Sequence, residues 1–154
     1  MAILGIDERV LATGLTLFWA LWFAIVFFTN LFGALRAAGA VGADWKFASK
    51  NYESVARAVS LYSAPSWVPR ALFAGVLAWQ LAAAFLYAAA FCAFASGGAA
   101  SMGLVDTAFG TGIGLFAAFM LADEITIKYA YEQAHELLLI AQLASLALVH
   151  ALHG

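Results

Sequence analysis

Four long apolar runs constrain the fold of this 154-residue chain more than any other feature of its sequence. The runs cover about 11–35, 69–95, 103–122 and 129–152, and each reaches the length of about 20 residues that a helix needs to cross hydrocarbon. Because lipid offers no hydrogen bonds to a backbone, such segments form helices rather than open strands. The sequence therefore predicts an all-α fold, a four-helix transmembrane bundle in which residues 1–154 form a single integral membrane domain.

Charged residues are too scarce to cover the surface of a soluble domain. They make up 10% of the chain, whereas soluble proteins carry about 25%. The net charge of −2 provides no basic surface, which argues against a nucleic-acid partner. Cys92 is the single cysteine, so an intrachain disulfide is impossible. Asp7 and Glu8 contrast with the basic start of a secretory signal, and we expect the first run to remain as a membrane helix.

Residues 36–68 are the one segment of ordinary soluble composition, and we expect them to lie at the membrane interface. Val55, Val59 and Tyr62 recur at helical spacing, which predicts a short amphipathic helix within the segment. Trp45 and Trp67 are of the residue type that favours the headgroup level of a bilayer. This segment would therefore be an interfacial connection between the first two spanning helices.

The positive charges predict how the chain is oriented. If the four helices alternate in direction, one side of the membrane receives six of the seven Lys and Arg residues: Arg36, Lys46, Lys50, Arg57, Arg70 and Lys128. The other side receives Arg9. The positive-inside rule then places the 36–68 loop in the cytoplasm and both termini outside, with the chain in the bacterial inner membrane.

Small residues recur along the third run and predict close helix packing. The row consists of Gly103, Thr107, Gly110 and Gly114 at spacings of three and four. Small side chains at this spacing let helix backbones approach closely. A cofactor lying against the same glycine face is the alternative interpretation. Two amides in other runs, Asn30 and Gln80, are expected to form hydrogen bonds between helices.

A row of polar side chains at the start of the fourth run is the only hint of chemistry in the sequence. Polar groups are costly in a membrane helix and usually face protein, ligand or water. The candidates for a ligand or proton site are Glu124, Lys128, Tyr131, Glu132, His135 and Gln142. In the alternative interpretation, most of these residues simply mark the membrane boundary, with only His135 and Gln142 inside it.

Glu132 and His135 have the Glu-x-x-His spacing found in di-iron bundles, but the motif occurs once rather than twice. No complete intrachain di-metal site is therefore expected. A bis-histidine haem is not expected either, because all three histidines fall in the fourth run. His150 and His153 lie at its outer end. The cofactor remains unknown at this stage, with a quinone or a lipid as possible ligands.

Three stretches resemble a family of small bacterial four-helix integral membrane proteins of unknown function. They are FFTNL at 27–31, YESVARAVS at 52–60 and FAAFMLADE at 116–124. The chain departs from that family at Leu61-Tyr62, where a Met-Asp pair is typical, and at Ile125, where a Trp is typical. The resemblance implies a four-helix layout and no particular activity.

These observations predict a non-catalytic accessory subunit of a larger inner-membrane complex, such as a respiratory or other redox assembly. The half-complete polar row would then need a second contributor, and the partners would be membrane lipid and other membrane subunits or further copies of the chain. Two alternatives remain open. One is a small oligomeric transporter or channel coupled to protons or ions through Glu124, Glu132 and His135. The other is a quinone-reactive membrane subunit that uses His135.

Overall fold

The computed structural model describes residues 8–96, 102–127 and 129–153, and all regular structure in them is helical. Four helices are long: α1 (Glu8–Ala37), α3 (Val68–Ala95), α4 (Met102–Thr126) and α5 (Tyr129–His153). Each contains a stretch long and apolar enough to cross a membrane. A short helix, α2 (Asn51–Ser60), lies between α1 and α3. The predicted all-α layout with four long apolar helices is confirmed. The third long helix extends four residues beyond the predicted end at 122.

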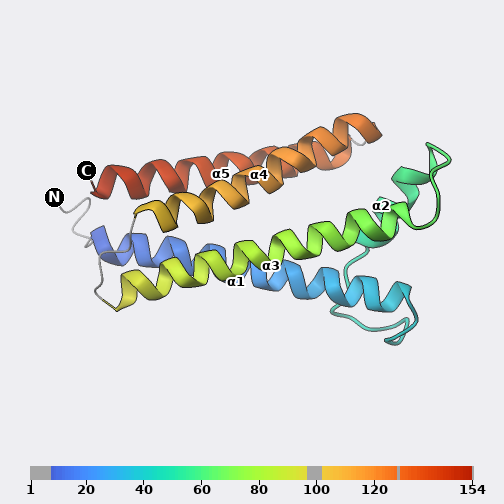
Figure 1. Ribbon diagram of the computed structural model, residues 1–154, viewed down its shortest axis with the longest axis horizontal. Helices are drawn as coiled ribbons and strands as arrows, with labels where there is room; N and C mark the ends of the chain where they lie inside the picture. The colour runs from blue at the N-terminus through green and yellow to red at the C-terminus, as the bar shows by residue number, and fades with distance from the viewer. Residues whose placement is uncertain (1–7, 97–101, 128, 154) are drawn as a thin grey trace.

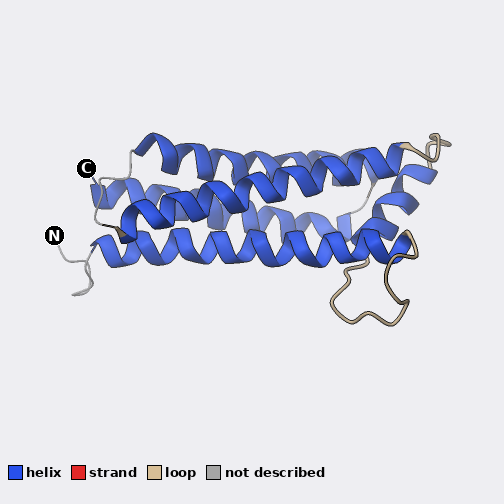
Figure 2. Ribbon diagram, turned by 60° about the horizontal axis from the view of Figure 1, so that its bottom comes forward, coloured by secondary structure: helices blue, strands red, loops and turns tan. Residues whose placement is uncertain are grey.

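The four long helices run side by side in one elongated bundle (Figures 1 and 2). The packing is most extensive between α1 and α3 and between α4 and α5, and α3 also packs against α4. Both ends of the chain lie at one end of the bundle, whereas α2 and the α4–α5 turn lie at the other (Figure 1). The segment 36–68 and this turn therefore share one end of the bundle, as helix alternation predicts.

The core is built from large side chains that repeat along one face of each helix. In α1 the buried positions include Ala12, Thr16, Trp19, Phe23 and Asn30, at the spacings of three and four that place residues on one helix face. The opposite face of α1 is exposed and apolar: Leu17, Phe18, Leu21, Ile25 and Phe28. Such a face suits lipid or the helix of another subunit.

Aromatic rings fill the middle of the bundle. The ring of Phe23 stacks on that of Tyr87 with centroids 5.7 Å apart and on that of Phe116 at 5.9 Å. Phe109 meets Tyr87 edge to face at 5.0 Å. All four side chains are at most 1% exposed. These contacts hold α1, α3 and α4 together, since the rings come from three helices.

The α2 segment packs against the ends of α1 and α3. The ring of Tyr52 meets that of Phe73 in α3 edge to face at 5.5 Å, and Ala58 is the buried residue of the helix. The predicted short helix is therefore present. Tyr62, however, was expected on its apolar face and instead lies beyond the helix end, 56% exposed, where its hydroxyl donates to the backbone carbonyl of Ile125. The chain leaves the helix after Ser60, before a further turn could bring Tyr62 onto that face.

Candidate functional site

A histidine of α5 pairs with an aspartate of α4 near each end of the α4–α5 hairpin. At the α2 end, Nδ1 of His135 lies 2.5 Å from a carboxylate oxygen of Asp123. At the other end, Nε2 of His150 lies 2.6 Å from a carboxylate oxygen of Asp106. The first pair is mostly buried and the second is half-exposed. The pairs join two helices that run in opposite directions.

The His135–Asp123 contact fixes the orientation of the imidazole. When the carboxylate is ionised it accepts a hydrogen bond from Nδ1–H of the neutral imidazole, so the lone pair of Nε2 is available to an external donor. The ring of Phe119 lies 4.9 Å from the imidazole, and a quarter of the His135 side chain is exposed. The arrangement can accept a hydrogen bond, or hold a proton, at the edge of the apolar bundle.

A second polar contact lies in the middle of the bundle. The hydroxyl of Tyr87 donates to Oε1 of Gln142 at 2.5 Å, and both side chains are fully buried. Nε2 of Gln142 has no partner among the described residues. Gly112 in α4 makes room for this amide, because a Cβ at that position would lie 2.7 Å from Oε1. One turn further along α5, Ser145 accepts a hydrogen bond from the indole of Trp19 at 3.1 Å.

The predicted polar row does not form one continuous helix face. The chain leaves α4 after Thr126 and turns at Ile127, whose φ of 54° is in the left-handed region. Glu124 therefore belongs to α4, whereas Glu132, His135 and Gln142 belong to α5. Of the α5 residues, Tyr131 is 49% exposed, and Glu132 and His135 are half-buried. Lys128 and the side chain of His153 lie outside the described part of the structure.

Sequence reasoning missed the partners of this row. Asp123 was not among the predicted site residues, yet it is 8% exposed and bonded to His135. Tyr87 carried no prediction at all. Both His–Asp pairs could have been found from the geometry of an antiparallel hairpin, because two residues face one another across it when their residue numbers add up to nearly the same total. The buried rings of Phe109 and Phe116 lie along α4 between the two His–Asp pairs. Among the described residues, no chain of hydrogen bonds links one pair to the other.

The predicted row of small residues faces away from the rest of the chain. Gly103, Thr107 and Gly110 are exposed, and a Cβ built on Gly103 or Gly110 meets no atom within 4 Å. Gly114 is the exception in the row, because a Cβ built there would lie 3.2 Å from the ring of Trp79 in α3. The close approach inside the bundle is made by Gly112 instead. The row is thus open along most of α4 and does not form a seam within the chain.

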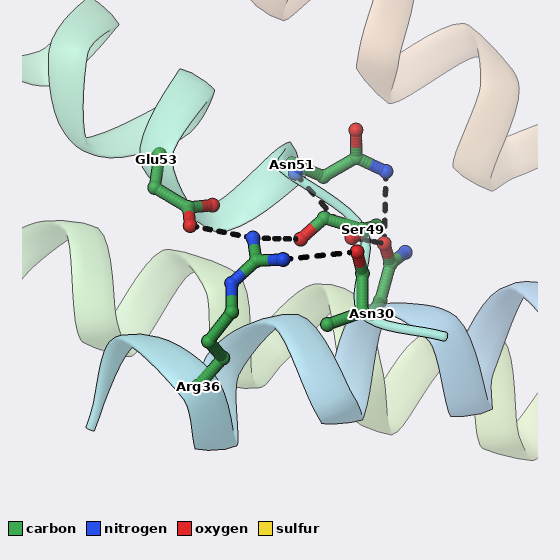
Figure 3. Close-up of polar contacts among 6 residues, drawn as sticks. Asn30, Arg36, Ser49, Asn51 and Glu53 are labelled. Atoms are coloured by element: carbon green, nitrogen blue, oxygen red, sulfur yellow. Dashed lines mark hydrogen bonds and ion pairs between the residues drawn. The ribbon is translucent and has the colours of Figure 1, made fainter. Parts of the chain in front are cut away.

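The most extensive polar network lies at the α2 end, centred on Asn30 (Figure 3). The Asn30 amide nitrogen donates to Oε1 of Gln80 at 3.1 Å, which confirms the hydrogen bond between helices that was expected for both residues. Its Oδ1 accepts from the hydroxyl of Ser49 and the amide of Asn51, each at 2.8 Å. A single buried side chain therefore ties α1 to α3 and to the start of α2.

The backbone reinforces this network. The amide of Ser49 donates to the carbonyl of Thr29 at 2.9 Å, so the connection before α2 returns along α1 by about two turns from its end. Gly33 permits this approach, because a Cβ there would lie only 2.6 Å from the carbonyl oxygen of Ser49. We refer to Asn30, Gly33, Ser49, Asn51 and Gln80 as the Asn30 lock.

An ion pair closes the lock on its outer side. Arg36 donates to Oε1 of Glu53 at 2.7 Å and to the carbonyl of Ser49 at 2.8 Å (Figure 3). Burial acts to raise the pKa of Glu53, but the hydrogen bond and the positive charge of Arg36 outweigh it. The pKa therefore lies below the ordinary value of 4.5. The guanidinium of Arg36 is therefore paired with a carboxylate of the same protein.

Acidification should loosen the start of α2. Because the folded-state pKa of Glu53 is depressed, the ion pair contributes its full stability above the unfolded pKa of about 4.5 and loses it as the pH falls through the folded value. The protection of the amides of residues 49–60 against hydrogen exchange, corrected for the intrinsic exchange rate at each pH, should therefore fall as Glu53 becomes protonated. In a Glu53→Gln variant the exchange should be faster at neutral pH and lose most of this pH dependence. An unchanged pH profile in the variant would contradict this role of Glu53.

Among the described residues, no group of three or more His, Cys, Asp or Glu side chains could hold a metal ion. Comparison with protein families, curated proteins and solved structures gives no match to this chain. Its function must therefore be argued from the features above.

Proposed function

We propose that the chain is an integral membrane protein and acts as a non-catalytic accessory subunit of a larger complex in the bacterial inner membrane, such as a respiratory or other redox assembly. The observation that carries the proposal is the open row of Gly103, Thr107 and Gly110 on α4. Without a hydrophobic driving force in lipid, helices associate through close backbone packing, and rows of small residues permit it. Since this chain does not use the row internally, the row suits a helix of another subunit.

The pairing of the polar groups supports the same proposal. His135 and His150 each bond an aspartate of the same chain, and Gln142 bonds Tyr87. The two His–Asp contacts fasten the α4–α5 hairpin together, and the Gln142–Tyr87 contact joins α5 to α3. The remaining long surface is apolar and rich in large side chains, including Leu137, Ile140 and Leu143 on α5. A chain built in this way offers a rigid apolar surface against which other membrane helices can pack.

One observation favours a second candidate, a quinone-reactive subunit. Asp123 holds His135 so that Nε2 can accept a hydrogen bond from the hydroxyl of a quinol. The neighbouring Phe119 ring offers an apolar face for a ligand ring. A partner subunit would have to supply the remaining residues of such a site, because few of the described acids and histidines lie near His135. The two candidates therefore share the requirement for a partner.

The test compares two glycine variants in the native membrane. Solubilised in mild detergent, the wild-type chain should migrate with partner subunits in a complex much larger than 16.3 kDa. Gly110→Leu should release it as a smaller species, because the bulky side chain keeps the partner helix away. Gly14→Leu is the matched control, since Gly14 is also exposed with no atom within 4 Å of a Cβ, but lies on α1.

Three outcomes decide between the alternatives. A wild-type chain that migrates alone would overturn the proposal. Equal effects of the two leucine variants would show that the α4 row is not the contact. If the complex is intact, its quinone content and absorption spectrum distinguish a bound redox cofactor from an assembly without one, and thereby separate the two candidates.

A further inference from the structure

We propose that the α2 end of the bundle carries a binding surface for anionic phospholipid headgroups. The inference rests on the proposed membrane location but not on the accessory role. The surface consists of the exposed cations Lys46, Lys50, Arg57 and Arg70, together with the exposed rings of Trp45 and Trp67.

Positive charge exceeds negative charge between residues 36 and 70, although the charge of Lys50 also acts on Glu53. Arg36 is the basic residue that pairs with Glu53, whereas Lys46, Lys50, Arg57 and Arg70 form no ion pair in the part of the chain that the structure describes. The other described acid between 36 and 70 is Asp44. The surface therefore keeps a surplus of positive charge. Anionic lipid attracts each Lys or Arg near a membrane surface by about 1 kcal/mol.

The aromatic side chains place these cations at the right depth. The rings of Trp45 and Phe47 pack on Phe32 of α1, with centroid distances of 5.6 and 6.2 Å. Each ring is still about half exposed. Phe32 lies about one and a half turns inside the end of α1, so these rings lie beside the apolar helix rather than beyond it. Lys46 lies between them in the sequence, and a tryptophan with neighbouring cations is typical of the headgroup level.

The Asn30 lock makes this surface preorganised. Ser49 and Asn51 fix the chain on both sides of Lys50, and the Arg36–Glu53 pair fixes the first turn of α2. Arg57 follows Lys50 by seven residues, which places the two on nearly the same face of α2. Lys50 and Arg57 therefore start from a fixed scaffold, and a headgroup need not order this part of the surface in order to bind.

The opposite charge gathers on the other side of the same end. The α4–α5 turn carries Glu124, Glu132 and Glu136, all at least partly exposed. Figure 1 shows this turn and the connection before α2 on opposite sides of the bundle. Anionic headgroups are therefore attracted to the side that carries Lys46 and Lys50 and repelled from the three glutamates across the bundle from it.

The experiment uses the full chain in vesicles that contain equal amounts of phosphatidylcholine and phosphatidylglycerol, with bromine on the acyl chains of one lipid or the other. Bromine quenches nearby tryptophan. The signal of the surface is the part of the quenching that disappears when Trp45→Phe and Trp67→Phe are introduced. We expect brominated phosphatidylglycerol to quench this part at least about twofold more than brominated phosphatidylcholine, because the cations enrich the anionic lipid locally.

Charge variants provide the controls. Replacing the four cations by glutamine should bring the ratio of the two quenching values to about one. Lys46→Arg with Lys50→Arg should preserve the enrichment, because the charge is retained. In the unmodified protein, about 1 M salt shortens the screening length to about 3 Å and should also abolish the enrichment, which tests the proposal even if the glutamine variant does not fold.

The outcomes are separable. A ratio of one in the wild-type protein, or enrichment that survives both the charge removal and the salt, would overturn the proposal. A dimer held through these cations to the acidic turn of a second copy, in place of lipid enrichment, would overturn it as well. Failure of the membrane location would look different, because neither brominated lipid would then quench the tryptophans.

Discussion

Replacing Asn30 with leucine is expected to destabilise the protein by about 2–4 kcal/mol and to release the start of α2. Leucine removes the donor to Gln80 and the acceptor for Ser49 and Asn51. Gln80 is 2% exposed, so its Oε1 would be left buried without a partner, and such a loss costs about 1–3 kcal/mol. Unfolding by a denaturing detergent measures the change in stability, and proteolysis between 38 and 50 measures the release of the segment.

A double-mutant cycle separates the hydrogen bond from general damage to the core. Gln80→Leu alone should also destabilise the protein, since it leaves the Asn30 amide nitrogen unpaired. The Asn30→Leu, Gln80→Leu variant should cost at least about 1 kcal/mol less than the sum of the two single changes, because the two residues are in direct contact. Strictly additive losses would refute the coupling between α1 and α3 through these amides.

Phe23→Ala should destabilise the protein by about 3–5 kcal/mol. Phe23 is fully buried, and its ring stacks on Tyr87 of α3 and Phe116 of α4. Its removal leaves a cavity where three helices meet. The free energy of unfolding in mixed micelles measures the loss.

Phe28 supplies the matched control for this truncation. It is the same residue type in the same helix, but it is 49% exposed on the outward face. Phe28→Ala should change the stability of the isolated chain by less than about 1 kcal/mol, because no packed cavity forms. If both alanine variants lost the same stability, the described core would be in the wrong place.

The number and approximate ends of the long helices could be predicted because length and apolar composition alone determine them. The four predicted runs match α1, α3, α4 and α5, with differences of up to four residues at their ends. The hydrogen bond between Asn30 and Gln80 was also foreseeable in kind, since a buried amide in lipid needs a partner. Its extension to Ser49 and Asn51 was not, because a loop gives no periodic signal that reports where it packs.

Which side of α4 points into the bundle could not be predicted from the sequence, for a physical reason. The apolar stripe of an amphipathic helix reveals its inner face, but a helix as apolar as α4, which could cross a membrane, is apolar on all sides. Gly110 and Gly112 are therefore indistinguishable in sequence, although the first faces outward and the second accommodates Gln142. The same ambiguity concealed Asp123, whose inward position depends on how α4 is rotated. The assignment of Glu124 to the α5 face failed because the turn at Ile127 divides the row.

The Asn30 lock also sets the order in which the contacts at the α2 end of the bundle can form during synthesis. Asn30 finds Ser49 and Asn51 only 19 and 21 residues later, but Gln80 follows 50 residues later. A nascent chain that has delivered α1 and α2 thus still lacks the acceptor for the Asn30 amide nitrogen. The seating of α2 is completed only when α3 arrives beside α1. A fully packed α2 therefore requires that α1 and α3 have already come together.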